Sequence, residues 1–298
     1  MPPDPKSGLV LVDKPRGPTS HDVVSRVRRA LGTRSVGHAG TLDPMATGLL
    51  VVLVGDATRL ATWATTEDKR YLATIVLGRG TDSLDADGAV TEERSISPEI
   101  AADLDRAVAA SVAAELARTE QVPPAVSAIH VDGERAHELV RRGETPVLPP
   151  RITHARSIDV LAVRAGPLPE VDVALWVDKG YYVRSFARDL GAHLGVPAHL
   201  SALRRTASGA FVVGDACPLE PDAIREHFVP LRDALPRVLT CVELTEDGAL
   251  RARQGKRLSR DGFAVAPPPG IAAWTFEGTP IAVGERTEDE WRVVRGFP

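Results

Sequence analysis

Hydrophobic residues recur with two different spacings in the first part of the chain. Residues 8–12 and 48–55 are continuous apolar runs, a pattern that is typical of buried strands. Residues 23–31 place valine and leucine three and four positions apart, so they can form the apolar face of a helix. Gly32 is suited to end this helix, and the polar stretch at residues 33–44 predicts a loop. The predicted order is therefore strand, helix, loop and strand.

The same two spacings continue through most of the chain. Residues 98–120 are rich in alanine and predict a helix, and residues 185–194 predict an amphipathic helix. Apolar positions of the strand type occur at residues 70–77, 158–163, 171–177 and 209–213. Strands and helices do not alternate regularly, as they would in a parallel sheet, so the pattern predicts the α+β class.

Two segments do not follow these spacings of apolar residues. Residues 121–150 are rich in proline, arginine and glycine, which predicts an insertion that leaves the core. From about residue 239 to 298, short apolar runs are divided by glycine and proline, which predicts a small β-rich domain. We therefore expect a large domain at residues 1–238 and a small one at 239–298.

Composition narrows the class of protein. Of the 298 residues, 43% are hydrophobic and 26% are charged, as in ordinary globular proteins. No run approaches the roughly 18 apolar residues of a membrane-spanning helix, and the first residues lack the apolar stretch of a signal peptide. We expect a cytoplasmic protein with no membrane contact. Cys217 and Cys241 are too few for a disulfide framework or a cysteine-rich zinc site.

The net charge of −4 is unevenly distributed. Residues 82–120 hold ten acids and three arginines, whereas residues 179–205 hold five lysines and arginines and a single aspartate. The first 45 residues carry seven basic side chains against four aspartates. One basic face of such a molecule can bind a polyanion, although the same charges also suit a solvated surface with no partner.

The loop at residues 37–44 reads Gly-His-Ala-Gly-Thr-Leu-Asp-Pro. Its glycines allow a ligand to approach the backbone closely, and Pro44 stiffens the chain behind Asp43. An aspartate on a glycine-rich loop is nevertheless more often a turn residue or helix cap than a nucleophile. The loop alone therefore leaves the role of Asp43 open.

Spacing argues against several other chemistries. An aspartyl phosphatase would need a second acid at Met45, and a dinucleotide fingerprint would need glycine at Ser83. An EF-hand loop beginning at residue 83 would end at Arg94, which cannot bind calcium. A zincin helix would need its second histidine at Arg141. We therefore expect neither a metal site nor a cofactor.

Seven blocks of sequence closely resemble the signatures of the TruB pseudouridine synthases. They stand in the family's order over roughly residues 9–213. Each block alone is moderately specific, but coincidence is a poor explanation for seven in order. The blocks are residues 13–20, 37–48, 69–71, 81–88, 123–128, 182–191 and 203–206.

The resemblance implies a fold and a reaction. The expected catalytic domain has a mixed, mainly antiparallel sheet flanked by helices, and the C-terminal domain is expected to be PUA-like. The implied reaction converts the T-loop uridine of tRNA to pseudouridine-55 by base flipping and needs no cofactor. The expected partner is the T stem-loop of tRNA, and we expect a monomer without an obligate protein partner.

The resemblance also implies catalytic residues. Asp43 is the expected catalytic carboxylate, and it can attack ribose C1′, attack uracil C6 or abstract a ribose proton. Arg184 is expected to pair with Asp43 and to keep it ionised. Tyr71 is expected to stack on the target base and to take part in proton transfer. These three residue types suit a reaction that breaks and remakes a glycosidic bond.

Four further positions match the family's substrate contacts. His38 is expected to fill the stack that the flipped nucleotide leaves, while Tyr182 lines the pocket and Leu203 touches the base. Lys14 binds a phosphate or supports the site. Phosphate contacts are also expected from arginines of the insertion and its end, namely Arg135, Arg141, Arg142 and Arg151.

The insertion departs from the family pattern at Val126, where an aromatic residue is usual, and at Ile129-His130. These departures affect the expected contacts with RNA and not the expected reaction. Two alternatives remain: a guide-RNA-dependent synthase of the dyskerin type, and a non-catalytic tRNA-binding or tRNA-folding protein on the same scaffold.

Overall fold

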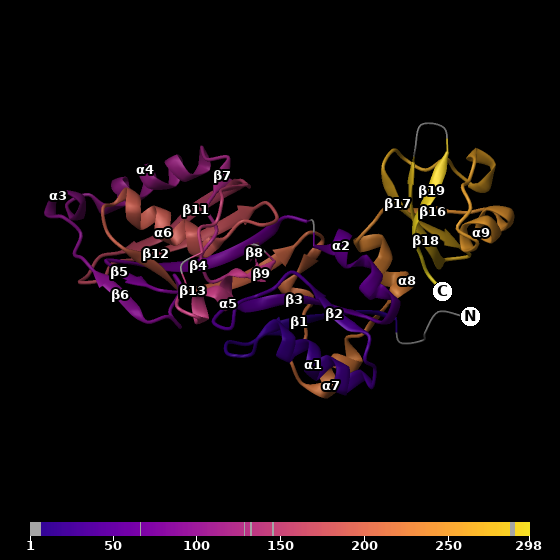
Figure 1. Cartoon of the computed structure of the whole chain (residues 1–298), viewed down its shortest axis with the longest axis horizontal. Coiled ribbons are helices and arrows are strands. Elements are labelled where there is room, and N and C mark those ends of the chain that lie inside the picture. The colour runs from indigo at the N-terminus through magenta and orange to yellow at the C-terminus, as the bar shows by residue number, and fades with distance from the viewer. Residues whose placement is uncertain (1–6, 66, 128, 132, 145, 287–289) are drawn as a thin grey trace. The chain divides into compact units, whose positions relative to one another are not determined.

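The computed structural model describes residues 7–65, 67–127, 129–131, 133–144, 146–286 and 290–298 (Figure 1). The chain forms two compact units. The first unit comprises residues 1–44, 48–66 and 209–298, and the second comprises residues 45–47 and 67–208.

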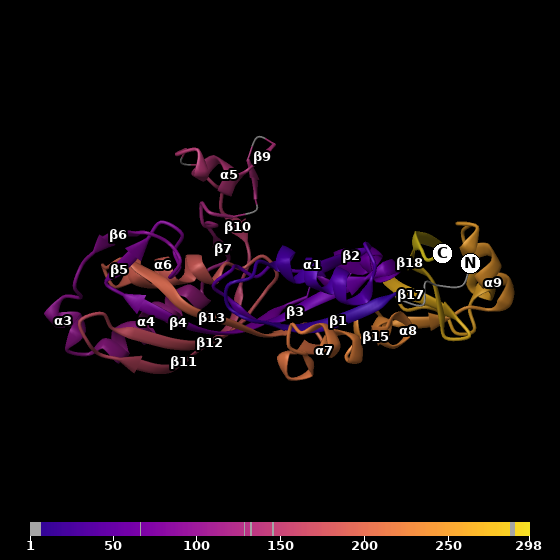
Figure 2. The same ribbon diagram turned by 90° about the horizontal axis from the view of Figure 1, so that it is seen from below.

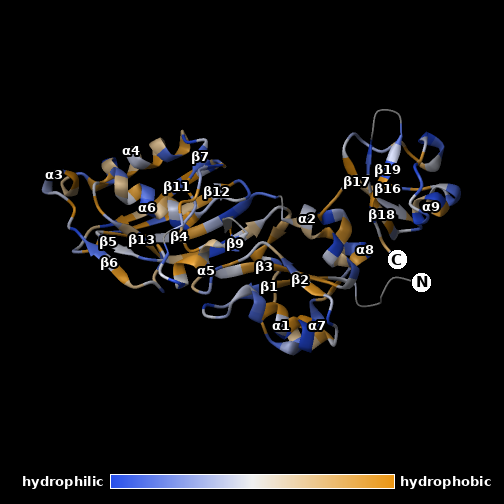
Figure 3. Cartoon of the chain, viewed as in Figure 1, coloured by the Kyte–Doolittle hydropathy of each residue, from blue (hydrophilic) through white to orange (hydrophobic). Residues whose placement is uncertain are grey.

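The first unit is built on a pair of apolar strands. β1 (Gly8–Lys14) runs antiparallel to β3 (Thr47–Val54), with Gly8 opposite Val54 and Lys14 opposite Gly48. Figure 3 shows the hydrophobic character of both strands, and Leu9, Leu49 and Leu53 lie in the buried core. The strands predicted at residues 8–12 and 48–55 are therefore confirmed.

One prediction in this region is wrong. Residues 33–44 are not a continuous loop, because β2 (Val36–Ala39) pairs antiparallel with β3. The segment is polar in sequence, yet the backbone gains hydrogen bonds from the edge of an apolar strand. His38 consequently lies in a strand, opposite Val52.

The predicted helix is α1 (Ser20–Leu31), and both of its ends are capped. Thr19 accepts a hydrogen bond from the Asp22 amide at 3.1 Å, and the Asp22 carboxylate accepts one from the Thr19 amide at 2.9 Å. Gly32 ends the helix with a φ of 62°, a conformation that glycine adopts without strain. The face with Val23, Val24 and Val27 is buried.

Short elements complete the first unit. Gly8 and Leu9 at the free edge of β1 pair with β15 (Val229–Pro230). The other elements are η1 (Gly55–Leu60), α2 (Ala61–Ala64), β14 (Phe211–Val212), η2 (Val213–Asp215), α7 (Pro221–Glu226), α8 (Leu231–Ala234) and η3 (Leu235–Arg237).

The C-terminal segment is β-rich, as predicted. β16 (Cys241–Glu243), β17 (Ile271–Phe276), β18 (Thr279–Arg286) and β19 (Trp291–Gly296) form a four-stranded sheet in that order. α9 (Glu246–Arg253) and η4 (Arg260–Gly262) complete the segment. The ring centroids of Phe263 and Trp274 lie 5.2 Å apart in its own small core. The boundary at residue 238 stays a prediction.

The second unit contains a four-stranded antiparallel sheet in the order β11-β12-β4-β13. α4 and α6 lie together on one face of this sheet (Figure 1). The strands predicted at residues 70–77, 158–163 and 171–177 and the helix at 185–194 are confirmed. The elements are β4 (Lys69–Leu77), α4 (Leu104–Leu116), β11 (Ala155–Arg164), β12 (Glu170–Val177), α6 (Val183–His193) and β13 (Ala198–Ser208).

Two predictions for the second half of the fold need correction. The strand predicted at residues 209–213 is reduced to β14 (Phe211–Val212), and the preceding strand β13 was not predicted, because buried polar side chains such as Arg205 break its apolar alternation. The helix predicted at residues 98–120 is interrupted at Asp103, whose carboxylate caps α4 by accepting from the Arg106 amide at 3.3 Å. The first piece of the interrupted helix is α3 (Pro98–Ala101), and nearby β5 (Arg79–Thr81) pairs with β6 (Val90–Glu93).

Within the second unit, the insertion leaves the sheet between two paired strands. β7 (Glu120–Gln121) runs antiparallel to β10 (Arg151–Ile152), and the chain between them stands out from the sheet (Figure 2). It contains β8 (His130–Val131), β9 (Glu134–Arg135) and α5 (Ala136–Arg141). The α+β class is confirmed by these mainly antiparallel sheets and their flanking helices.

Candidate active site

The Asp43 loop is anchored on both sides of the carboxylate. Ser20, buried at the start of α1, accepts a hydrogen bond from the Leu42 amide at 2.9 Å and donates to the Leu42 carbonyl at 3.0 Å. On the other side, the Pro44 carbonyl accepts hydrogen bonds from the Gly17 amide at 2.9 Å and from Lys14 Nζ at 3.1 Å. Asp43 is half-buried between these two fixed residues. Such anchoring holds a catalytic side chain in place better than a free loop does.

Lys14 is completely buried in the first unit. Its ammonium group donates to the carbonyls of Pro15 and Pro44, each at 3.1 Å. A buried ammonium group that holds the loop backbone fits the expectation of site support better than a direct phosphate contact, which needs an accessible cation.

His38 also belongs to the first unit and points from β2 toward α1. Its ring lies edge-on to that of His21, with the centroids 6.5 Å apart and an interplanar angle of 81°. The structure thus brings Lys14 and Ser20 to the Asp43 loop and places His38 on the neighbouring strand.

Tyr71 and Leu203 lie on one face of the second unit's sheet. Tyr71 in β4 stands opposite Arg205 of β13 and Leu175 of β12, and Leu203 stands opposite Ala73. Since side chains alternate along a strand, Tyr71 and Ala73 share a face, and Leu203 is the diagonal neighbour of Tyr71. Tyr71 is half-buried and Leu203 is 8% exposed. An aromatic ring and an apolar side chain on one face can hold a flat base between them.

Two buried cations on this face were not predicted as site residues. Lys69 precedes Tyr71 by two positions and is 7% exposed, and Arg205 is 1% exposed. Burial, followed by repulsion from Arg205, lowers the pKa of Lys69 to about 8. The sequence places Lys69 two residues before Tyr71, and alternate residues of a strand share a face. The apolar pattern alone, however, does not show that a lysine at this position is buried.

Arg184 lies in the first turn of α6 and is 7% exposed. Its Nη1 atom donates to the Ser83 carbonyl at 3.0 Å and lies 3.8 Å from Oδ2 of Asp85, which is itself buried. Asp85 in turn accepts from Ser83 Oγ at 2.6 Å. The loop after β5 therefore fixes the guanidinium group, and Asp85 is a contact that the sequence analysis missed. Because Asp43 belongs to the other unit, its pairing with Arg184 stays a prediction.

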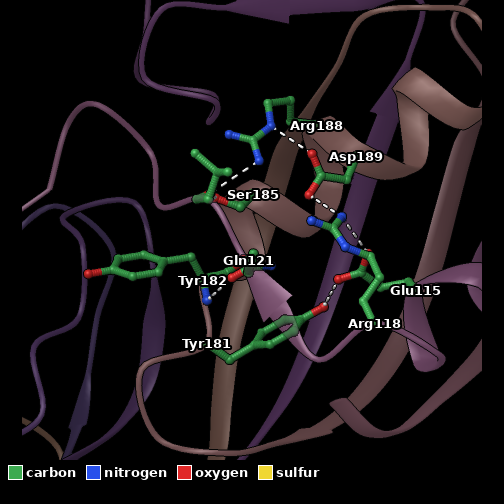
Figure 4. A network of polar contacts seen from close by, with 9 residues as sticks. Glu115, Arg118, Gln121, Tyr181, Tyr182, Ser185, Arg188 and Asp189 are labelled. Atoms are coloured by element: carbon green, nitrogen blue, oxygen red, sulfur yellow. Dashed lines mark hydrogen bonds and ion pairs between the residues drawn. The ribbon is translucent and has the colours of Figure 1, made fainter. Parts of the chain in front are cut away.

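Tyr182 is held by the start of the insertion. The amide of Tyr182 donates to Gln121 Oε1 at 2.8 Å, and its carbonyl accepts from Gln121 Nε2 at 3.1 Å (Figure 4). The Tyr182 side chain packs against the small core of the insertion, which consists of Ile129, Ala136 and Leu148. The structure therefore joins Tyr182 to the insertion.

The insertion's arginines differ in what surrounds them. Arg142 pairs with Glu134 and, at 2.9 Å, with Glu144, whereas Arg151 is exposed. The side chains of Arg135 and Arg141 lie outside the described residues. Contact of these four arginines with phosphates stays a prediction.

The described part of the chain contains no cluster of three or more potential metal-binding acids, histidines or cysteines. Within the same residues, no helix is long and apolar enough to cross a bilayer. The first unit supplies an anchored carboxylate, and the second unit separately supplies a buried arginine, two further cations and an aromatic ring. These groups can stabilise charge, bind a flat base and move protons.

Two solved structures share this fold. The chain matches a protein in a structure described as an H/ACA RNP bound to a substrate RNA containing 2′-deoxyuridine, with a TM-score of 0.71 and 23% identity over 99% of this chain and 86% of that one. A chain of a Cbf5-Nop10-Gar1 complex matches with a TM-score of 0.70 and 24% identity over 98% and 84% of the two chains. These likenesses show that the chain shares the fold of these two proteins.

Sequence comparison then gives the family. The family model described as TruB family pseudouridylate synthase (N-terminal domain) matches residues 28–183. The chain is 43% identical over 296 residues to tRNA pseudouridine synthase B of Leifsonia xyli, covering 98% of this chain and 97% of the relative. It is 46% identical over 288 residues to the protein of the same name from Cutibacterium acnes, covering 96% and 95%. The chain belongs to the TruB family, as its seven sequence blocks predicted.

Proposed function

We propose that this protein is an isomerase that converts the T-loop uridine of tRNA, position 55, to pseudouridine. The observation that carries the proposal is the Asp43 loop, in which both neighbours of the carboxylate are hydrogen-bonded into place. Relatives that match almost the whole chain at 43% and 46% identity bear the name tRNA pseudouridine synthase B. An isomerisation of this kind needs neither an oxidant nor a group donor, so an anchored carboxylate suits it.

The reaction breaks the bond between ribose C1′ and uracil N1, rotates the base and joins C1′ to C5. The proton on C5 is lost and N1 gains one, so the product is an isomer of the substrate. Asp43 acts on C1′, on C6 or on a ribose proton, and it must be ionised to do so. We propose that Arg184 pairs with Asp43 and favours this ionised form. The contacts of Arg184 with Ser83 and Asp85 support this role, because they hold the guanidinium group in one orientation.

The substrate-binding roles follow from the faces on which the side chains lie. We propose that Tyr71 stacks on the flipped uracil, that Leu203 contacts the same base and that Tyr182 lines the pocket. Stacking on an aromatic ring replaces about 1–3 kcal/mol of the base stacking that flipping removes. His38 fills the place of the flipped nucleotide in the RNA stack, and Lys14 supports the Asp43 loop.

The proposed RNA contacts follow from the folded shape of the RNA loop and from the positive charge of the insertion's arginines. The protein recognises a folded loop with unpaired bases, and the exposed Arg151 and the other arginines of the insertion contact phosphates. Affinity for tRNA therefore falls as salt rises, because phosphate contacts release counterions. We further propose that residues 239–298 act as a PUA-like domain, and that the protein works in the cytoplasm as a monomer without an obligate partner.

Two alternatives make different predictions for the purified chain. A guide-dependent enzyme would leave an unmodified T stem-loop unchanged unless guide RNA and partner proteins were added. A non-catalytic tRNA-binding protein would bind the stem-loop and never modify it.

The test uses the purified protein, an unmodified tRNA transcript and the variant Asp43→Asn. This change removes the charge while keeping the size of the side chain. We expect pseudouridine formation by the native protein alone, none by the variant and similar tRNA affinity for both. Modification by the variant at the native rate contradicts the role of Asp43, and complete loss of its tRNA binding shows that Asp43 is structural.

A further inference from the structure

β7, at the start of the insertion, is hydrogen-bonded to the backbone just before α6. Gln121 is 2% exposed, and its side-chain amide bonds both the N–H and the carbonyl of Tyr182, at 2.8 and 3.1 Å. Glutamine offers the donor and the acceptor that this pair of contacts requires. The two residues are 61 positions apart in the sequence, so this contact ties the insertion directly to the segment that leads into α6.

The residue after Gln121 holds the next turn of α6. The Val122 carbonyl accepts hydrogen bonds from Ser185 Oγ at 2.8 Å and from Arg188 Nη2 at 3.1 Å (Figure 4). Ser185 is fully buried, whereas Val122 is exposed. Gln121, the last residue of β7, and Val122 directly after it thus hold the start and the first two turns of the helix that carries Arg184.

A chain of ionic contacts secures the same helix from the other side. Arg188 bonds Asp189 at 2.7 Å, and Arg118 bonds Asp189 at 2.7 Å and Glu115 at 3.0 Å. The Tyr181 hydroxyl donates to Glu115 at 2.8 Å, and burial raises the pKa of both groups. The network therefore runs from Tyr181 through Glu115 and Arg118 to Asp189 of α6, as Figure 4 shows.

The two residues that follow the returning strand β10 contact the start of the same segment. Thr153 Oγ1 donates to the Lys179 carbonyl at 3.4 Å, and the Asp178 amide donates to the His154 carbonyl at 2.9 Å. Gln121 at the start of the insertion and two residues just after its end are therefore bonded to residues 178–182. The insertion's core also packs on the Tyr182 side chain. A displacement of the insertion must consequently shift Tyr182 and, two residues later, Arg184.

We propose that Gln121 is a positioning residue that couples the insertion to Tyr182 and Arg184. When RNA binds the insertion, the two hydrogen bonds from the Gln121 side chain keep the Tyr182 backbone in place. Arg184 then keeps its orientation toward Ser83 and Asp85. Gln121 touches neither substrate nor reacting atoms and acts through the backbone of Tyr182. This inference rests on the proposed function, because it assigns the insertion to RNA and Arg184 to catalysis.

The test compares Gln121→Met, which keeps the size of the side chain but removes both hydrogen bonds, with Gln121→Glu. Protonated glutamic acid has one donor and one acceptor, so it restores both contacts, whereas the carboxylate restores only one. Burial raises the pKa of such an acid, so lowering the pH from 8 to 6 favours the protonated form. Glu120→Gln, on the exposed side of the same strand, is the matched control.

The measurement is the single-turnover rate at saturating unmodified tRNA, with tRNA affinity and amide hydrogen exchange of Tyr182 measured in parallel. We expect Gln121→Met to lower the rate about tenfold or more, to change affinity less than about twofold and to speed exchange of the Tyr182 amide. The rate of Gln121→Glu, relative to the native protein, is expected to rise as the pH falls. Glu120→Gln is expected to behave like the native protein.

The inference is overturned if folded Gln121→Met keeps the native rate, or if the relative rate of Gln121→Glu does not change with pH. A merely structural role would lower thermal stability but would leave this pH dependence absent. The native protein and Asp43→Asn are assayed beside these variants. An inactive native protein contradicts the proposed function, whereas an active native protein with unaffected Gln121 variants contradicts only the positioning role.

Discussion

Replacing Lys69 with methionine is expected to stabilise the protein near neutral pH. The Lys69 side chain lies 7% exposed on the covered face of the second unit's sheet, in the electrostatic field of Arg205. Its Nζ atom donates to the Glu67 carbonyl, and Glu67 is exposed, so water can replace this hydrogen bond. Methionine has a similar length and no charge, so it can fill the same space.

The magnitude follows from the lowered pKa. Burial, with a further contribution from Arg205, lowers the pKa of Lys69 from its usual 10.5 to about 8. Each tenfold change in proton affinity corresponds to about 1.36 kcal/mol, so the charged lysine costs at most about 3.4 kcal/mol of folding free energy. Lys69→Met should recover a part of this, about 1–3 kcal/mol at pH 7.

The pH dependence carries a definite sign. Below pH 8 the lysine is charged in both the folded and the unfolded protein, so burial of the charge lowers the stability by its full amount. Between about pH 8 and 10.5 only the unfolded protein keeps the proton, so the native protein gains stability as the pH rises. The advantage of Lys69→Met should therefore shrink over this range.

Urea unfolding of both proteins from pH 7 to 10.5 measures this difference, because groups common to both proteins cancel. Lys179→Met, at an exposed lysine, is the control and should change stability by less than about 0.5 kcal/mol. A difference between native protein and Lys69→Met that stays constant with pH would refute the reasoning.

Three further changes test other contacts. Asp85→Asn removes the buried charge 3.8 Å from Arg184 and should lower the single-turnover rate about tenfold or more; a native rate would exclude this contact from the site. Ser20→Ala removes both hydrogen bonds to Leu42 and should cost about 1–3 kcal/mol in urea unfolding as well as slow the reaction, and no change in either quantity would contradict the anchoring of the loop. Gly284→Ala would place a methyl group 1.9 Å from the Trp274 ring, so thermal unfolding should show a loss of about 2 kcal/mol or more, and an unchanged melting temperature would disprove this close packing.

Local patterns predicted the parts of the fold that local physics determines. The apolar runs of β1 and β3 and the spacing of α1 are readable because burial of these elements depends on their own residues. β13 was missed since Arg205 is buried within it, and only the rest of the sheet makes that burial possible. β2 was missed because a polar segment became a strand through the edge that β3 offers.

The candidate site divides in the same way. The Asp43 loop was found from its sequence blocks, but nothing in the block that contains Ser20 shows that its hydroxyl anchors Leu42, 22 residues later. Gln121 carries no signal of its own, because its partner is a backbone 61 residues away. Sequence therefore identified side chains expected to meet the substrate, together with Lys14 as a support, whereas Ser20 and Gln121 became visible as supports only in three dimensions.

The central claim is that this chain alone makes pseudouridine at one position of tRNA through Asp43. The most direct measurement incubates the purified protein with an unmodified tRNA transcript and maps every pseudouridine in the product. The account predicts pseudouridine at position 55 in the T loop with the native protein and none with Asp43→Asn. An unmodified transcript, or a pseudouridine at another position only, would contradict it.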